Sequence, residues 1–258
     1  MTFQTIVLLS LIQGITEFLP ISSSAHLLLF PVLLHITDQG IITDVFAHLG
    51  SLFAVMIFYK NDIKDMFLSL FDKKHNRKIL YALIIATLPI VFVGLLFLVL
   101  GIELRNPKIV IYTSIIFGSL FYIADKFGKK KFSLNKLSLK NAFYIGMVQV
   151  LASIPGVSRS GITTTCGLFL GYKREDILKF SFLLSIPTIA LVCGGGILKF
   201  ALNPQPISFI PLIGVSIFSF IFSLISMKFM MSWIKYSSFK PFAIYRVILG
   251  IFLYLYLK

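Results

Sequence analysis

The chain has 258 residues, of which 57% are hydrophobic and only 13% are charged. Together with a mean hydropathy of +0.93, this composition excludes an ordinary soluble domain and fits a polytopic helical membrane protein. A net charge of +14 would suggest nucleic acid as the partner of a soluble protein. Here the basic residues lie between hydrophobic runs, so we expect them to face anionic membrane lipids, and we expect no nucleic-acid partner.

The chain opens with two apolar helices that are both too short to cross a bilayer. Residues 3–18 would extend roughly 24 Å as a helix, whereas the hydrocarbon core is about 30 Å thick. Pro20 ends this helix, and the serines at 22–24 can cap a second one over about 23–35. Two short helices around a polar break predict a re-entrant hairpin or a broken helix.

The segment 141–171 repeats this opening pattern, with its polar break at 153–160. The other apolar stretches are long enough to span a bilayer, and they cover about 44–59, 79–100, 109–125, 180–198, 208–227 and 241–257. We therefore predict an all-α polytopic membrane protein, with six transmembrane helices plus two re-entrant helical hairpins, in a single integral membrane domain over 1–258.

Lysine and arginine are concentrated in alternate loops. The loops at 60–78, 126–140, 172–179 and 228–240 hold 18 of the 24 Lys and Arg residues. The positive-inside rule places these four basic loops in the cytoplasm.

A shift of 136 residues aligns the first hairpin with the second. It matches Gln13 with Gln149 and Ser22 with Ser158, and the same shift also matches Ser24 with Ser160 and Phe46 with Phe182. These matches predict half-repeats of about 1–125 and 136–258. Because three spans separate the hairpins, the second copy is inverted, so hairpin 1 opens outward and hairpin 2 opens toward the cytoplasm.

In the first hairpin, Gln13 and Glu17 share a helix face just before the break. Glu17 is either a protonated acid hydrogen-bonded to a neighbour, or a metal ligand or general acid/base. His26 is either structural or suited to proton transfer. Ser22, Ser23 and Ser24 are either helix caps or include a nucleophile beside a base.

In the second hairpin, Ser158 and Ser160 flank Arg159 where a helix is expected to begin. The free N–H groups of a helix start bind anions, and the planar fork of arginine pairs with phosphate oxygens. Thr163 shares a helix face with Ser160 and adds a hydroxyl. The alternative for Arg159 is an internal ion pair with Glu17, and both roles hold together if substrate or metal mediates between them.

These residue types suit phosphoryl transfer on a phosphorylated lipid, because that reaction needs positioning and charge neutralisation above all. The alternative is a transporter or flippase of polyprenyl phosphates, which would need no nucleophile. A membrane lipid phosphatase with a Ser-Arg-x5-His-x3-Asp motif is excluded, because Thr165 stands where the histidine is required. Secondary site candidates are Asp44, His48, Gln149, Tyr245 and Arg246.

Two motifs carry a family resemblance: Gln13-x-x-x-Glu17-Phe-Leu-Pro-Ile-Ser-Ser-Ser-Ala-His26 and Pro155-Gly-Val-Ser-Arg-Ser-Gly-Ile-Thr163. They closely resemble the undecaprenyl-pyrophosphate phosphatases, the bacitracin-resistance family, and the resemblance covers essentially the whole chain. It implies hydrolysis of undecaprenyl pyrophosphate to the monophosphate and inorganic phosphate in the bacterial plasma membrane. This reaction recycles the lipid carrier for peptidoglycan and other envelope polymers, and overproduction confers bacitracin resistance.

The resemblance also implies roles for single residues. Glu17 would be the essential acid and a ligand of a divalent cation, Mg²⁺ or Ca²⁺, while Ser23 and His26 match the nucleophile and its proton-transfer partner. The pyrophosphate would be bound by Ser158, Arg159 and Thr163, and we add Gln13, Ser22 and Ser160 to this substrate-binding set.

Gln13 stands where many relatives have glutamate, which leaves one anionic metal ligand fewer. Attack by serine or by metal-bound water stays open, as does a homo-oligomer. The family resemblance implies a site that opens to the outer face.

Overall fold

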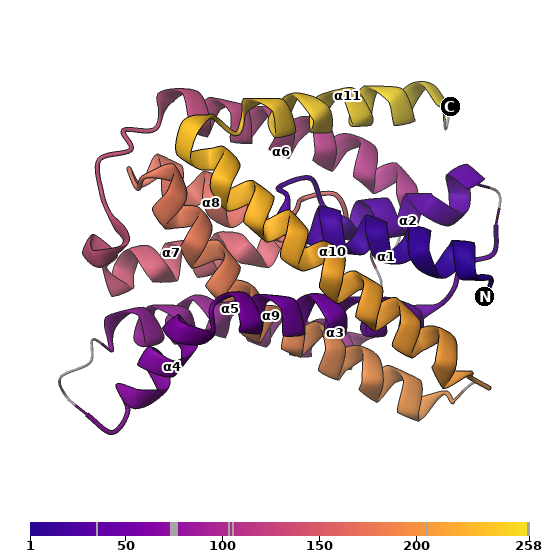
Figure 1. Cartoon of the computed structure of the whole chain (residues 1–258). Coiled ribbons are helices and arrows are strands. Elements are labelled where there is room, and N and C mark those ends of the chain that lie inside the picture. The colour runs from indigo at the N-terminus through magenta and orange to yellow at the C-terminus, as the bar shows by residue number, and fades with distance from the viewer. Residues whose placement is uncertain (35, 73–76, 103, 105, 205, 257–258) are drawn as a thin grey trace.

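In the computed structural model, the described residues are 1–34, 36–72, 77–102, 104, 106–204 and 206–256, and within them the secondary structure is helical, without a β-strand (Figure 1). Some of the counted basic residues lie outside the described ranges: Lys73 and Lys74 of the loop at 60–78, and Arg105 and Lys258, which belong to none of the four basic loops. The predicted all-α class is confirmed.

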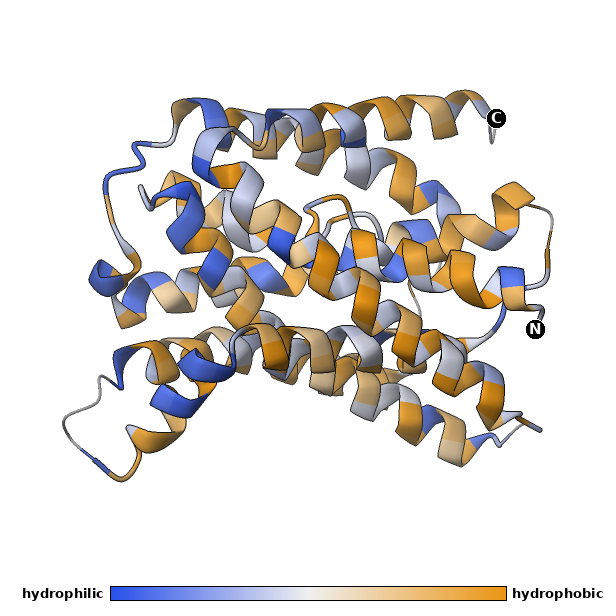
Figure 2. Cartoon of the chain, in the orientation of Figure 1, coloured by the Kyte–Doolittle hydropathy of each residue, from blue (hydrophilic) through white to orange (hydrophobic). Residues whose placement is uncertain are grey.

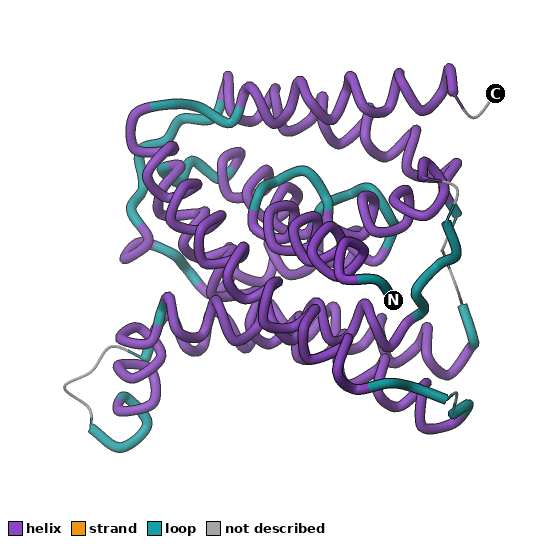
Figure 3. Tube along the Cα trace, turned by 45° about the vertical axis from the view of Figure 1, so that its right-hand side comes forward, coloured by secondary structure: helices purple, strands orange, loops and turns teal. Residues whose placement is uncertain are grey.

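Both predicted hairpins are present. The first consists of α1 (Phe3–Phe18) and α2 (Ser23–Leu34), and the second of α7 (Leu139–Gln149) and α8 (Arg159–Phe169), with a short 3₁₀ turn after α7. The two hairpins enter from opposite ends of the molecule and their tips meet near its centre (Figure 1). Figure 3 shows the loops of these tips enclosed among helices. The chain therefore turns twice inside the membrane protein.

Within the described ranges, five helices are long and apolar enough to cross a membrane: α3 (Ile41–Phe58), α5 (Lys78–Leu100), α6 (Pro107–Phe127), α9 (Arg174–Leu202) and α10 (Phe209–Tyr236). The sixth predicted span is α11 (Lys240–Tyr256), a helix of 17 residues that packs along α6 (Figure 1). Large apolar side chains point outward from these helices; Phe92 and Val99 of α5 are 70% and 81% exposed. Such surfaces are expected to face lipid.

Three of the predicted basic loops contain more helix than expected. The loop at 60–78 begins with α4 (Lys60–Leu68), α9 already starts at Arg174, and α10 continues to Tyr236. The amino-acid composition of a helix changes where the helix leaves the hydrocarbon core. Its backbone hydrogen bonds continue unchanged, because lysine is a good helix former in water. The membrane boundary is therefore not the end of the helix.

The helix contacts follow the predicted repeat. α1 packs on α10 as α7 packs on α5, and α3 packs on α10 as α9 packs on α5. The aligned serines also match: Ser22 and Ser158 both have φ in the left-handed region, 78° and 68°. Their hydroxyls cap equivalent positions, accepting from the backbone N–H of Ala25 at 3.4 Å and of Gly161 at 3.1 Å. The residue bounds of the half-repeats stay a prediction.

The end of the molecule where α4 lies is strongly hydrophilic (left in Figure 2). We call it the charged end, because α4 and the loops that follow α6 and α8 carry lysine and arginine residues. There the buried carboxylate of Asp125 accepts hydrogen bonds from Arg174 Nε at 2.5 Å and from the backbone N–H of Phe239 at 3.0 Å, and it pairs with Lys130 at 3.8 Å. Burial and the Arg174 guanidinium lower the pKa of Lys130, against the raising effect of Asp125. This network joins the ends of α6, α9 and α11.

Close helix contacts depend on small residues, as is common in membrane proteins. At Gly50 of α3, an added Cβ would clash with the backbone oxygen of Ser216 and lie 2.9 Å from the nitrogen of Phe220, both on α10. At Gly194 of α9, nothing lies within 4 Å of the same atom.

We expect Gly50→Ala to destabilise the protein by about 1–3 kcal/mol or more, because α3 and α10 must separate to admit the methyl group. Gly194→Ala is the matched control and should be neutral or slightly stabilising, since alanine favours the helix. Thermal unfolding of the purified protein in detergent compares the two. Equal melting temperatures would contradict the tight α3–α10 contact.

Candidate active site

The tips of the two hairpins are bonded directly to one another. Ser160 Oγ, in the first turn of α8, donates a hydrogen bond to the backbone oxygen of Leu19 at 3.3 Å, just after α1 ends. The ring of Phe18 meets the ring of Phe182 on α9 edge to face, with centroids 5.3 Å apart. These contacts bring Glu17 and Arg159, 142 residues apart in sequence, to one place.

Glu17 is the centre of the site. Its Oε1 accepts a hydrogen bond from Arg159 Nη2 at 2.9 Å, which is also an ion pair. Its Oε2 accepts from Ser23 Oγ at 2.6 Å and from Gln13 Nε2 at 3.3 Å. Arg159 Nη1 donates to the backbone oxygen of Ser181 at 2.8 Å. The internal ion pair weighed for Arg159 is therefore present.

His48, a secondary candidate, belongs to the same site. Its Nε2 lies 3.7 Å from Glu17 Oε2. Its Nδ1 lies 2.7 Å from the backbone oxygen of Asp44, one turn earlier on α3. Because a carbonyl only accepts, Nδ1 carries the hydrogen and Nε2 is the nitrogen turned toward Glu17. Gln13 Nε2 also donates to Ser51 Oγ at 3.2 Å, so α3 lines one wall of the site.

The predicted phosphate-binding hydroxyls are mostly engaged in holding the hairpin tips. Ser22 and Ser158 cap the starts of α2 and α8. Thr163 Oγ1 donates to the backbone oxygen of Arg159 at 2.8 Å and lies 2.8 Å from Ser181 Oγ. The hydroxyl of Thr163 thus supports the turn that carries Arg159, and the structure does not bring it to Glu17.

His26 is not the hydrogen-bond partner of Ser23 among the described residues. Its Nδ1 lies 2.7 Å from the backbone oxygen of Ser22, and its Nε2 lies 2.7 Å from the hydroxyl of Tyr245 on α11. The two rings are stacked, with centroids 5.8 Å apart. The Ser23 hydroxyl donates to Glu17 instead, and the proton-transfer role that the family resemblance implies for His26 stays a prediction.

Arg246 supports the loop that precedes Arg159. It is 1% exposed, and its Nη2 donates at 2.8 Å to the backbone oxygens of both Gly156 and Val157. Thr113 Oγ1 donates to the preceding carbonyl of the same loop, that of Pro155, at 2.8 Å. The Pro-Gly break is therefore satisfied by side chains from α6 and α11, as non-helical backbone at membrane depth requires.

Sequence reasoning missed Ser181 as a site residue and did not give Ser51 a role. Both lie in stretches that resemble the family, Phe180-Ser-Phe-Leu-Leu-Ser185 and His48-Leu-Gly-Ser51. A serine in an apolar helix is a weak signal, since it often only bonds the carbonyl one turn earlier. Gln149, the repeat mate of Gln13, is structural here: it donates to the backbone oxygen of Ala86 at 3.3 Å and accepts from Thr188.

The site offers donors for a single divalent cation. Among the described residues no group of three His, Cys, Asp or Glu side chains is arranged to hold a metal. Glu17 contributes one carboxylate, and Gln13 Oε1 is a fully buried oxygen with no hydrogen-bond partner in the described part of the chain. Oxygen donors of this kind fit Mg²⁺ or Ca²⁺, although one carboxylate alone supplies little negative charge.

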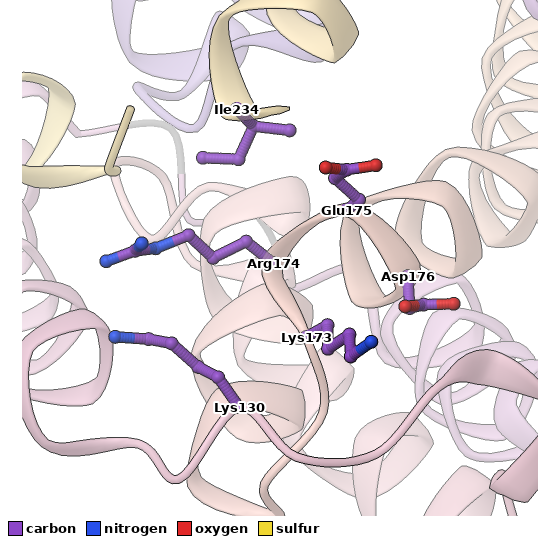
Figure 4. A pocket seen from close by; sticks show the side chains of 6 residues that line it. All are labelled: Lys130, Lys173, Arg174, Glu175, Asp176 and Ile234. Atoms are coloured by element: carbon purple, nitrogen blue, oxygen red, sulfur yellow. The ribbon is translucent and has the colours of Figure 1, made fainter. Parts of the chain in front are cut away.

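A separate pocket of about 320 Å³ lies at the charged end of the molecule, away from the hairpin tips (Figure 4). Its lining residues are Lys130, Lys173, Arg174, Glu175, Asp176 and Ile234. The charged ends of Lys130 and Arg174 point the same way in Figure 4, toward the side where both pair with Asp125. The lining holds three cations and two carboxylates, and Asp125, the partner of Lys130 and Arg174, balances the third cation. We therefore regard this pocket as part of the ion-pair network.

Comparison with known proteins identifies the family. Residues 6–252 match the family described as bacitracin resistance protein BacA. The chain belongs to this family. The undecaprenyl-diphosphatase of Alteromonas mediterranea is 44% identical over 97% of both chains, and that of Campylobacter curvus is 44% identical over 96% of both. The undecaprenyl-diphosphatase of Alcanivorax borkumensis is 41% identical over 99% of this chain and 98% of its own. The family resemblance of the two motifs is confirmed.

For this BacA-family protein, we expect Glu17→Gln to cost about 3–5 kcal/mol of stability, because it leaves the Arg159 guanidinium buried without a counter-charge. The double variant Glu17→Gln/Arg159→Met should recover most of that loss, since no charge is then stranded. Thermal unfolding in detergent measures both. Additive losses in the double variant would show that the two side chains are not coupled.

Proposed function

We propose that this protein hydrolyses undecaprenyl diphosphate to undecaprenyl phosphate and inorganic phosphate. The observation that carries the proposal is the junction of the hairpin tips, where Arg159, Glu17 and Ser23 are hydrogen-bonded within an apolar helical bundle. A lipid-linked diphosphate reaches such a site from the membrane. Relatives named undecaprenyl-diphosphatase, similar over nearly their whole length, support the same activity.

Arg159 is proposed to hold the diphosphate. Its side chain is 10% exposed at the start of α8, where first-turn N–H groups and the helix dipole favour an anion. In the structure it is held by Glu17 and by the carbonyl of Ser181. A diphosphate brings further negative charge to Arg159, which weakens its hold on Glu17 and makes that carboxylate available as a base.

Glu17 is proposed as that base. The hydroxyl of Ser23 already donates to Glu17 Oε2 at 2.6 Å, so its proton can pass to the carboxylate as the attacking oxygen bonds to the terminal phosphorus. The bond from that phosphorus to the bridging oxygen breaks, and its electron pair leaves with undecaprenyl phosphate. If Ser23 is the nucleophile, water then hydrolyses the phosphoserine; if water attacks directly, Ser23 orients Glu17.

His26 is proposed to relay protons rather than to activate Ser23. Its ring is held between the Ser22 carbonyl and the Tyr245 hydroxyl, and it is only partly buried. A proton released from Glu17, or one required by a product phosphate, can pass through such a ring. A divalent cation, Mg²⁺ or Ca²⁺, held by Glu17 would supply neutralisation of the charge that develops on the phosphate oxygens.

A flippase of polyprenyl phosphates is not favoured. Binding and moving an anion needs Arg159 and a helix start, but it does not need a hydroxyl donating to a buried carboxylate, as Ser23 does to Glu17.

With purified protein in detergent, we expect phosphate release from undecaprenyl diphosphate. We expect Glu17→Ala or Arg159→Ala to lower the rate about 10²–10³-fold, the scale of losing one transition-state electrostatic contact. Arg159→Lys should also lose most activity, because a point charge cannot replace the planar fork. Arg174→Lys is the matched control, since lysine can still pair with Asp125 outside the site, and it should remain active. A wild-type protein that binds the lipid without releasing phosphate would refute the proposal.

We further propose that the protein lies in the bacterial plasma membrane with its four basic loops in the cytoplasm and its site open to the outer face. The charged end of the molecule and the open end of hairpin 1 are opposite one another, which supports this orientation (Figures 1 and 2).

Cysteine labelling tests the orientation in intact cells, in a background with Cys166 and Cys193 replaced by alanine. We expect a membrane-impermeant maleimide to label Thr37→Cys, between α2 and α3, and Ser24→Cys, at the hairpin tip. Lys129→Cys, in the basic loop after α6, should be labelled only after permeabilisation. All three positions are exposed in the structure. The reverse pattern would invert the proposed topology.

A further inference from the structure

We propose that His48 is a ligand of the divalent cation at Glu17, with the amide oxygen of Gln13 as a further donor. The proposal concerns the make-up of the cation site, and it rests on the proposed function only for the diphosphate that accompanies the cation.

The orientation of His48 is the first argument. Its Nδ1–H donates to the backbone oxygen of Asp44 at 2.7 Å, so in the neutral imidazole Nε2 is the nitrogen that carries the lone pair. Metal-binding histidines typically donate their other N–H to a carbonyl or carboxylate in this way. Nε2 lies 3.7 Å from Glu17 Oε2, longer than a hydrogen bond but less than twice a typical metal–ligand distance of about 2.0–2.5 Å. One ion can therefore contact both atoms.

Gln13 supplies the second, independent argument. Its side chain is fully buried, and its Nε2 donates to Glu17 Oε2 and to Ser51 Oγ. Its Oε1 has no hydrogen-bond partner among the described residues. Buried acceptors are normally satisfied, so an orphan oxygen on the side chain that touches Glu17 indicates a missing partner. A cation, or a water bound to one, would satisfy it.

The charges of these residues predict how the cation binds. Glu17 is already neutralised by Arg159, while an unprotonated His48 and Gln13 carry no charge. A divalent cation alone would therefore bring two uncompensated charges into a buried site, which is unfavourable. A diphosphate compensates them, so cation and diphosphate should bind together. With one imidazole among few oxygens, the site should also prefer Mn²⁺ to Ca²⁺, which requires more oxygen ligands.

The test uses full-length protein in detergent with Mn²⁺ and methylenediphosphonate, a diphosphate that cannot be hydrolysed. Electron paramagnetic resonance measures bound Mn²⁺, and spin-echo modulation detects a directly bound imidazole nitrogen. We expect this nitrogen signal in the wild type and its loss in His48→Gln, with Mn²⁺ affinity at least about tenfold weaker. His26→Gln, on α2 of the first hairpin, is the matched histidine control for His48 on α3 and should keep the signal. In the absence of the diphosphonate, the Gln13→Glu variant should bind Mn²⁺ more tightly than the wild type does, because it adds a negative charge to the site.

Several outcomes would overturn the proposal. These are a wild-type protein without Mn²⁺ binding or without the nitrogen signal, a signal that persists in His48→Gln, and a signal that disappears in His26→Gln. A wild-type spectrum without the nitrogen signal rejects the proposal even if a variant does not fold. An active enzyme without the nitrogen signal would reject the site alone, whereas a nitrogen signal without phosphate release would reject the proposed activity alone.

Discussion

The ion pair between Glu17 and Arg159 is the interaction on which the rest of this structure depends. Either charge alone inside an apolar bundle would be costly, and the buried pair is tolerated because neighbouring groups hydrogen-bond to both of its members. Ser23 and Gln13 satisfy the carboxylate, and the Ser181 carbonyl satisfies the guanidinium. The two hairpins must therefore meet tip to tip.

Much of the surrounding framework can be understood as support for that meeting. A chain that breaks its helix at membrane depth exposes backbone groups that no water can satisfy. Arg246 and Thr113 bind the carbonyls of the second break, and the left-handed Ser22 and Ser158 cap the helices that leave each break. The tips are thus fixed before any substrate arrives, as catalysis by positioned charges requires.

The inverted repeat supplies two similar hairpins, and the site arises from their differences. Gln13 faces a carboxylate, whereas its mate Gln149 binds a neighbouring backbone carbonyl and a threonine. Glu17 occurs in one half and Arg159 in the other, so each half contributes one sign of charge. Glu17 Oε2 accepts hydrogen bonds from Ser23 and Gln13 and also lies near His48 Nε2. Its role in the reaction therefore depends on which of these partners the substrate displaces.

The sequence by itself determined the short helices, the polar breaks, the alternating basic loops and the prominence of Glu17 and Arg159, because a charge or a proline in an apolar run stands out without reference to other residues. It did not determine where α10 ends, since a helix continues in water without a change in its backbone bonds. Only the tertiary structure decided that Ser23 pairs with Glu17, that His26 turns to Tyr245, and that Ser181 holds Arg159. These choices depend on the packing of helices far apart in the chain, which sets the direction of each side chain.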